Sequence, residues 1–337
     1  MKSYLEATST STVEIGGVQL PRLILGNLPF LGESYQGPEM NKVYFTRFSN
    51  PENTFKVVKK AISTYGLTVI GVMPPIIGGL SRLFFEVLQK VMDETQVEIG
   101  LVSCFMIPLL IGGKKVDDYR RWITYYSIES KDNGELAGKY LNDPILLCRD
   151  GWKEGFAKAL RSNKPYSDGE IADMTLDRRR LDCMLDSLST FHNLLVEPGS
   201  ETDFLALTGR VDILQEVVEA SREKLGCPVV VGTHHAGSTI PILENSNISI
   251  SGYVTPVNAI GALMLPSRKK AFEALTHTKH SVIAIKPLAG GRIAPEEAFE
   301  YVFKKARVAA CMIGVASEDE LRQDVQAAQR FIANSAR

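Results

Sequence analysis

Two stretches near the carboxyl end of the chain decide the fold: Val282-Ile-Ala-Ile-Lys-Pro-Leu-Ala-Gly-Gly-Arg292 and Ala309-Ala-Cys-Met-Ile-Gly-Val-Ala-Ser-Glu-Asp319. Each is a short apolar run that ends in glycine or small residues and opens into a polar helical pattern. This is the pattern of a buried parallel strand that leads into a helix. Two such turns present backbone N–H groups and positive helix ends, so they predict a site for phosphate or another anion.

The same strand-then-helix pattern recurs toward the amino end. The predicted strands are 23–28, 67–73, 96–105, 193–197, 228–232, 248–254, 281–286 and 309–314. Eight buried strands alternating with helices predict an α/β fold, a (β/α)8 TIM barrel, with a doubly wound open sheet as the alternative. An N-terminal β-hairpin over 12–20, turning at Gly16-Gly17, can close the bottom of such a barrel.

The segment 106–180 breaks this repeat, and we interpret it as an elaborated insertion after the third strand of a single domain spanning 1–337. Its aromatic and charged stretch 117–126 is either a lid over the barrel mouth or a partly packed helix. The helices expected in the chain are 53–65 with Asn53 as cap, 81–92, 151–161, 177–189, 211–225, 238–244, 267–275, one from Pro295, and 318–333.

The composition is that of a globular protein, with 45% hydrophobic and 23% charged residues among 337. A net charge of -1 gives no reason to expect nucleic acid or an anionic membrane surface as a partner. Five scattered cysteines without a C-x-x-C pair favour a reducing compartment. The first twenty residues lack the pattern of a signal peptide, and the apolar run 101–112 is too short to span a bilayer. We therefore expect a soluble cytoplasmic protein with a small-molecule substrate.

Several motifs resemble the aldo-keto reductase superfamily. Lys286-Pro-Leu-Ala-Gly-Gly resembles its strand-seven turn, and Met312-Ile-Gly-Val-Ala-Ser-Glu-Asp-Glu-Leu321 resembles its strand-eight turn and final helix. The resemblance implies an oxidoreductase that acts on a small carbonyl compound with NADP as cofactor. It also implies the residues that hold the pyrophosphate and adenosine end of NADP(H): Leu288, Gly290, Gly314, Ala316 and Ser317. Asn258 lies where the family has a Tyr-Asn pair after strand six, so it is a further cofactor candidate.

The chain departs from this family at the catalytic positions. Family members use an Asp and a Tyr after strand two, a Lys on strand three and often a His on strand four, with Tyr as the acid. Here strand two ends Val69-Ile-Gly-Val-Met-Pro-Pro and strand three reads Glu98-Ile-Gly-Leu-Val-Ser-Cys-Phe. The sequence thus predicts a divergent reductase with a non-standard acid or base. The alternatives are a lyase, isomerase or hydrolase without redox chemistry, or a non-catalytic binding protein.

Strand ends of a barrel converge on one face, where the chain places acids, bases and donors. The convergent groups are Asn27, Glu33, Cys104, Glu197, His234, His235, Tyr253, Asn258 and Lys286. From these we select Glu197, His234, His235 and Lys286 as catalytic candidates. Cys104 is interpreted as a buried hydrophobe more than as a nucleophile.

Each catalytic candidate also has a structural interpretation. Glu197 is either a base with a raised pKa or a partner for Lys286. Adjacent residues on an extended chain point opposite ways, so at most one of His234 and His235 faces the centre. That histidine is a general base, a metal ligand beside Glu197, or a partner of a loop carbonyl, and we predict no metal site. Lys286 either forms a Schiff base or pairs with an anion or a carboxylate, so the substrate can be anionic or phosphorylated.

Overall fold

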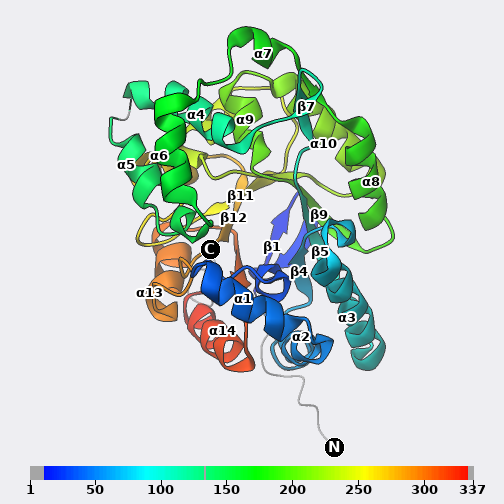
Figure 1. Ribbon diagram of the computed structural model, residues 1–337. Coiled ribbons are helices and arrows are strands. Elements are labelled where there is room, and N and C mark those ends of the chain that lie inside the picture. The colour runs from blue at the N-terminus through cyan, green and yellow to red at the C-terminus, as the bar shows by residue number, and fades with distance from the viewer. Residues whose placement is uncertain (1–10, 133, 333–337) are drawn as a thin grey trace, which may run out of the picture.

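The protein is a closed barrel of eight parallel strands surrounded by helices (Figure 1). The computed structural model describes residues 11–132 and 134–332. The barrel strands are β3 (Leu23–Gly26), β4 (Val69–Val72), β5 (Gly100–Phe105), β9 (Asn193–Pro198), β10 (Val230–Gly232), β11 (Gly252–Pro256), β12 (Ser281–Ile285) and β13 (Ala310–Gly314). They pair in the order β10-β11-β12-β13-β3-β4-β5-β9, and a parallel bridge between Val196 and Val229 closes the ring. The predicted (β/α)8 TIM barrel is confirmed.

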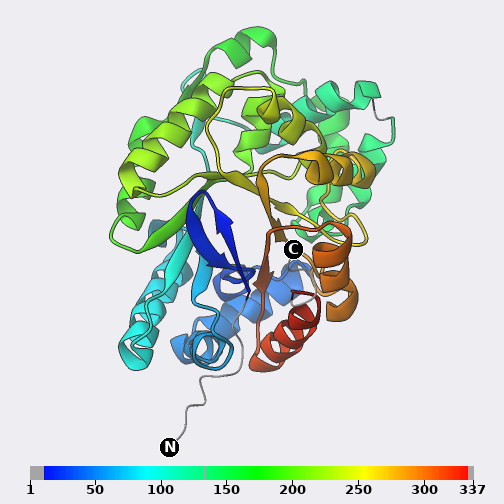
Figure 2. The ribbon, with the colours of Figure 1, turned by 180° about the vertical axis from the view of Figure 1, so that it is seen from behind.

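The interior of the barrel is a packed apolar cluster to which every strand contributes. Its strand members are Ile24, Val69, Val102, Leu195, Val230, Val254, Ile283 and Ala310. The hairpin β1 (Thr12–Ile15) and β2 (Val18–Pro21) adds Ile15 and Leu20 to this cluster. Its turn touches the residues that precede β10 and β11, since a Cβ on Gly16 would lie 2.6 Å from the Pro228 Cβ. The hairpin, dark blue in Figure 2, therefore closes the amino-terminal end of the barrel.

Amphipathic helices cover the outside of the strands and bury their apolar faces in a second, larger core. These helices are α2 (Pro51–Tyr65), α3 (Gly79–Thr95), α8 (Arg178–Leu188), α9 (Glu201–Leu207), α10 (Val211–Leu225), α11 (Ala236–Glu244), α12 (Arg268–His277), α13 (Pro295–Glu300) and α14 (Glu318–Ile332). A helix α1 (Pro38–Phe48) precedes them, and the last turn of α13 continues as the π-helix η5 (Tyr301–Lys305). Within the described residues, no helix is both long enough and apolar enough to cross a membrane.

Three local expectations are corrected by the structure. The helix expected to start at Asn53 begins at Pro51, because the Asn50 side chain accepts the Glu52 N–H and proline occupies the first helical position. The strand expected from Gln96 begins at Gly100, since Gln96 ends α3 with a φ of 55°. The strand expected over 248–254 is 252–256, and its first pairing is Gly252 with Ser281.

The segment between β5 and α8 forms a cap over the carboxyl-terminal ends of the strands (top of Figure 1). It contains a small antiparallel sheet and four helices: β6 (Leu109–Ile111), β7 (Lys114–Lys115), β8 (Met174–Leu176), α4 (Asp118–Glu129), α5 (Leu136–Asn142), α6 (Trp152–Ser162) and α7 (Asp168–Ala172). Short 3-10 turns complete the chain at η1 (Leu28–Leu31), η2 (Pro75–Ile77), η3 (Ser130–Asp132) and η4 (Leu146–Cys148). The stretch 117–126 is largely helix α4, whose Trp122 and Tyr125 are buried.

Candidate functional site

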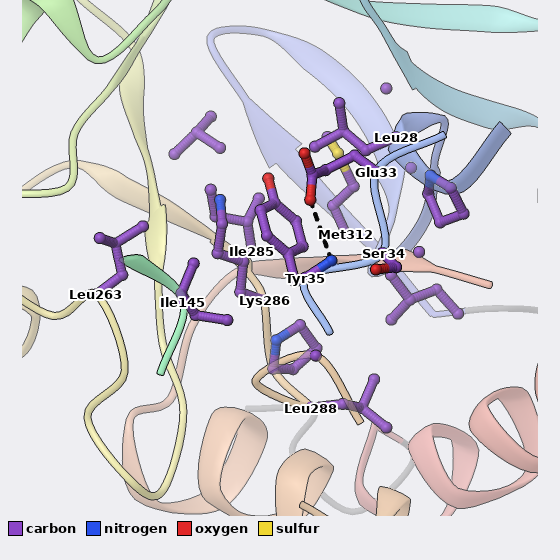
Figure 3. A pocket seen from close by; sticks show the side chains of 18 of the residues that line it. Leu28, Glu33, Ser34, Tyr35, Ile145, Leu263, Ile285, Lys286, Leu288 and Met312 are labelled. Carbon is purple, nitrogen blue, oxygen red and sulfur yellow. Dashed lines mark hydrogen bonds between the residues drawn. The ribbon is translucent and has the colours of Figure 1, made fainter. Parts of the chain in front are cut away.

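A cavity of about 910 Å³ lies at the carboxyl-terminal ends of the strands, beneath the cap (Figure 3). The strand ends supply Cys104, Glu197, His234 and Lys286 to its wall, and the loop after β3 supplies Tyr35. Three of the four residues predicted to be catalytic therefore share one cavity. The fourth, His235, lies outside its lining.

Lys286 is the first residue after β12 and projects into this cavity. Its backbone has a φ of 55°, a left-handed conformation that is rare for a residue with a long side chain and is associated with functional sites. The amine lies 4.8 Å from the centre of the Tyr35 ring, and within the described chain it makes no hydrogen bond or ion pair. Burial lowers the pKa of Lys286 to about 8, while the nearby Glu197 and Cys104 act in the opposite direction. The lysine is thus an accessible acid or base near neutral pH.

Tyr35 is a site residue that the sequence did not reveal. The Tyr35 N–H donates to Glu33 Oε1 at 3.1 Å, and the Tyr35 carbonyl accepts from Arg292 Nη1 at 2.8 Å. These bonds hold the ring between Glu33 and Lys286, as Figure 3 shows. Burial, followed by the Glu33 carboxylate, raises the pKa of the Tyr35 hydroxyl, which therefore stays protonated. Its place in a glycine-rich loop gave no periodic signal that would have marked it.

Glu197 lies on β9 directly opposite Cys104 on β5. Burial raises the pKa of Glu197 to about 8, against a hydrogen bond from Cys104 and the charge of Lys286. Gly232 at the end of β10 leaves room for this carboxyl group, because a Cβ there would be 2.7 Å from Glu197 Oε1. Glu197 is therefore a neutral proton donor at pH 7. Burial and Glu197 also raise the pKa of Cys104, so the thiol is no ready nucleophile.

The two adjacent histidines point in different directions, as expected for neighbours on an extended chain. His234 lines the cavity, and its pKa lies well below the ordinary value because of burial and then the charge of Lys286. His235 is buried beside α4, with its Nδ1 2.7 Å from Glu129 Oε2. Although burial opposes it, the Glu129 carboxylate raises the pKa of His235. His235 therefore joins the cap to the barrel and does not reach the cavity, which corrects its prediction as a catalytic group.

A buried carboxylate on α9 holds the turn that carries both histidines. Asp203 Oδ2 accepts the backbone N–H of His234 at 2.8 Å and of His235 at 3.2 Å. Asp203 Oδ1 accepts the hydroxyl groups of Thr233 and Thr239. The sequence did not reveal Asp203 either, because its hydrogen-bond partners lie on other elements of the fold.

Of the residues predicted to hold the phosphates and adenosine of the cofactor, three line the cavity and two lie at the start of α14 outside its lining. Leu288, Gly290 and Gly314 line the cavity. The Ala316 N–H is already bonded to Glu320 Oε2 at 2.7 Å, and Ser317 Oγ accepts the Glu320 N–H at 3.1 Å. These two bonds cap α14, so the amide of Ala316 is occupied in this structure.

Asn258 is placed away from the cavity. Its side chain is fully buried, donating to the Ala262 carbonyl at 2.9 Å and accepting the Ala262 N–H at 2.8 Å. Both ends of the amide therefore staple the loop after β11. The prediction that Asn258 contacts a cofactor is corrected, because the side chain is fully buried and does not line the cavity.

A metal site was a further possibility for the cavity-facing histidine. Across 11–132 and 134–332, no three His, Cys, Asp or Glu side chains gather closely enough to hold a metal ion. The interpretation of a cavity-facing histidine as a metal ligand beside Glu197 therefore gains no support. His234 and Glu197 remain candidates for proton transfer.

Comparison with known proteins identifies relatives of the fold. The sequence matches no protein-family model and no curated protein. A candidate aldo-keto reductase from Pseudomonas aeruginosa matches in structure with a TM-score of 0.56 and 15% identity, over 98% of this chain and 100% of its own. Another structure of a candidate aldo-keto reductase from that organism matches with a TM-score of 0.51 and 15% identity, over 94% of each chain. The chain therefore has the aldo-keto reductase fold, as the sequence motifs had indicated.

Proposed function

We propose that this protein is an NAD(P)H-dependent oxidoreductase that reduces a small carbonyl compound, with Lys286 as its proton donor. One observation carries the proposal: Lys286 and Glu197 share a cavity, and the pKa of each is about 8. A general acid works best when its pKa lies near the working pH. Neither Lys286 nor Glu197 lies after strand two, where the resembled family has the tyrosine that serves as its general acid.

The cavity supplies the same kinds of group as the resembled family, from different strands. A tyrosine, a lysine, a carboxyl group and a histidine are present as Tyr35, Lys286, Glu197 and His234. The tyrosine follows the first barrel strand and the lysine follows the seventh, whereas the family uses strands two and three. The ends of β4 and β5 lack the Asp, Tyr and Lys of the resembled family. This absence is consistent with proton transfer by residues on other strands of the barrel.

Each group has a defined role in this proposal. The ammonium of Lys286 and the neutral carboxyl of Glu197 donate hydrogen bonds to the substrate carbonyl oxygen. Lys286 then transfers its proton to that oxygen as negative charge develops there, and Glu197 returns a proton to the amine. Tyr35 positions the amine through its ring, and neutral His234 can hydrogen-bond the substrate without adding charge. NAD(P)H supplies the hydride when it is bound.

The residues around the cavity fit such a cofactor. The cavity extends from Lys286 to Gly290, Gly291 and Gly314. Gly290 and Gly291 have φ values of 70° and 77°, and the 15-residue helix α14 directs its positive end toward the neighbouring turn. Ser317 lies in a second recess, which is lined by the basic side chains of Arg47, Lys56 and Lys60 and by the acidic Glu318 and Asp319, with Lys60 paired to Glu318 at 2.7 Å. The glycine turn and the basic side chains would hold the phosphates, while Ala316 would contribute only if Glu320 moved.

A cofactor titration tests the proposal. NADH and NADPH are titrated against the protein while nicotinamide fluorescence is recorded, and oxidation of the bound cofactor is then followed with a panel of small aldehydes and ketones. We expect saturable binding and turnover, with turnover lost in Lys286→Met and retained in Lys269→Met, an exposed lysine on α12. No binding at millimolar cofactor would refute the proposal.

A second candidate function is favoured by the free amine of Lys286. A lysine with a pKa of about 8 is partly neutral at physiological pH, so its Nζ can attack a carbonyl carbon and form an imine with loss of water. Such an imine serves a lyase without a nicotinamide. Borohydride added with the carbonyl compound would reduce the imine and leave a mass increment on the Lys286 peptide. Trapping without any cofactor oxidation would favour this candidate over the first.

A further inference from the structure

Two arginines of the cap line the same cavity as Lys286. Arg121 lies on α4 and Arg149 lies just before α6, so both belong to the segment that interrupts the barrel repeat. His234 lies on the cavity wall with them. The cap therefore adds positive charge to a site whose proton-transfer groups come from the barrel.

Neighbouring side chains fix both guanidinium groups. Arg121 donates from Nη1 to Glu201 Oε1 at 2.9 Å and from Nη2 to Asp118 Oδ1 at 2.6 Å. Arg149 donates from Nη2 to Asp118 Oδ2, and its Cζ lies 4.7 Å from the centre of the Trp152 ring. A guanidinium has five N–H donors, so each arginine keeps donors beyond those its carboxylate partners use. Arg121 Nε is one of these, being buried without a partner within the described residues.

The two ends of the cavity carry different charged side chains. After burial, the cations that lower the pKa of His234 include Lys286, Arg121 and Arg149. At the far end, burial and then Glu320 raise the pKa of Asp324 to about 7. The cap end of the cavity is therefore the end that gathers the arginine side chains of Arg121 and Arg149.

We propose that Arg149 and Arg121 bind the carboxylate of a small oxo acid whose carbonyl group faces Lys286. This inference rests on the proposed function and names its substrate class. The cations Arg121, Arg149 and Lys286 lie near the carboxylates Asp118, Glu201 and Glu33, so the site has no large excess of positive charge. Such a site suits a singly charged carboxylate better than a doubly charged phosphate ester, which needs more compensating positive charge. The planar fork of arginine also suits the two oxygens of a carboxylate.

The protein contains its own reporter for this site. Its two tryptophans are Trp122, which lines the cavity, and Trp152, which stacks under Arg149, and their ring centres are 5.0 Å apart. Tryptophan fluorescence of the whole protein is titrated with pyruvate, with acetone as its uncharged counterpart, and with dihydroxyacetone phosphate. The titration requires neither cofactor nor turnover.

We expect a saturable response to pyruvate at concentrations where acetone gives none. Arg149→Gln should weaken pyruvate binding tenfold or more, because a charge-assisted pair of hydrogen bonds is lost. Arg149→Lys should weaken pyruvate binding less than Arg149→Gln does, since lysine keeps the positive charge but lacks the paired N–H donors of the guanidinium. The matched control is Arg178→Gln on α8, an exposed arginine paired with Glu216, and its affinity for pyruvate should be unchanged.

The possible outcomes separate this inference from the proposed function. Equal binding of pyruvate by the native protein and Arg149→Gln would overturn the inference, and so would tighter binding of dihydroxyacetone phosphate than of pyruvate. Reduction of uncharged ketones at an undiminished rate in Arg149→Gln, without selectivity for oxo acids, would retain the proposed function alone. Arginine-dependent binding of pyruvate without NAD(P)H oxidation would retain the carboxylate site and reject the reductase.

Discussion

The amine of Lys286 lies 4.8 Å from the centre of the Tyr35 ring, although the two residues come from opposite ends of the chain. A cation over an aromatic face is stabilised by roughly 0.5–2 kcal/mol. The ring therefore favours the ammonium form, and Tyr35→Leu should lower the pKa of Lys286 further. Tyr35→Phe keeps the ring and should keep the pKa.

The pH dependence of kcat/KM for carbonyl reduction measures this effect. In Tyr35→Leu the alkaline limb should move to lower pH, while in Tyr35→Phe it should stay in place. If Tyr35→Phe loses activity as severely as Tyr35→Leu, the hydroxyl is the important group, and Tyr35 would replace Lys286 as the proton donor.

Replacement of Lys286 by methionine should lower kcat by about 10²- to 10⁴-fold, the range that general acid catalysis contributes. The side chain is similar in length and apolar, so the fold should be retained. Steady-state kinetics with a saturating carbonyl substrate, together with circular dichroism, would show this. A native rate in Lys286→Met would remove the lysine from the mechanism.

The rate of reduction should fall as the pH rises above about 8, because Lys286 and Glu197 both lose their protons there. The reverse oxidation needs the deprotonated forms, so it should rise over the same interval. Glu197→Gln keeps a neutral hydrogen-bond donor but cannot titrate, and its profile should lose the Glu197 ionisation. An unchanged profile in Glu197→Gln would contradict the role given to this carboxyl group.

The buried pair of His235 and Glu129 should stabilise the protein most in a mildly acidic window. Burial opposes both charges, but the pKa of Glu129 is lowered and that of His235 is raised. The Glu129 contribution is present above the ordinary carboxyl pKa of 4.5 and is lost as pH falls through the lowered value. The His235 contribution is complete below the ordinary pKa of 6.5 and is lost as pH rises through the raised value.

Urea unfolding of Glu129→Gln tests the strength of this pair. Removing one partner of a buried pair leaves the other uncompensated, at a cost of about 3–5 kcal/mol. The difference from the native protein should be largest between pH 4.5 and 6.5, the interval set by the two ordinary pKa values. Glu135→Gln, an exposed residue before α5, serves as the control. Equal stability of Glu129→Gln and Glu135→Gln would show that the buried pair contributes nothing.

Glu320→Ala should bind NADPH several-fold more tightly than the native protein. The substitution releases the Ala316 N–H and removes a negative charge from the region where the cofactor phosphates would lie. Nicotinamide fluorescence during an NADPH titration would measure the gain. Weaker binding would mean that the cap on α14 matters more to the site than the freed amide.

Much of the barrel was predictable because its elements carry periodic signals. The expected helix 211–225 agrees with α10, and Gly226 ends it with a φ of 64°. The short apolar runs 194–196 and 282–285 marked the strands expected at 193–197 and 281–286. Helix α1 was not predicted, because its apolar pattern is weak. Only two of its side chains, Tyr44 and Phe48, are buried and mark the side that faces the core.

The site was only partly predictable, because contacts between distant residues create it. Glu197 and Lys286 could be selected from the rule that strand ends converge. Tyr35 could not, since its position depends on Arg292 holding its carbonyl and Glu33 holding its amide. Asn258 and Ala316 were assigned by motif position, and the structure shows their polar groups bonded to Ala262 and Glu320.

The hairpin at the amino-terminal end of the barrel determines where substrate can enter and product can leave. Ile15 and Leu20 seal that end with apolar side chains, so substrate and product share the opening beneath the cap. A product that lingers in the opening blocks the next substrate. Product inhibition should therefore be competitive with the carbonyl substrate, and the rate of turnover should respond to mutations that loosen the cap even where they touch no reacting atom.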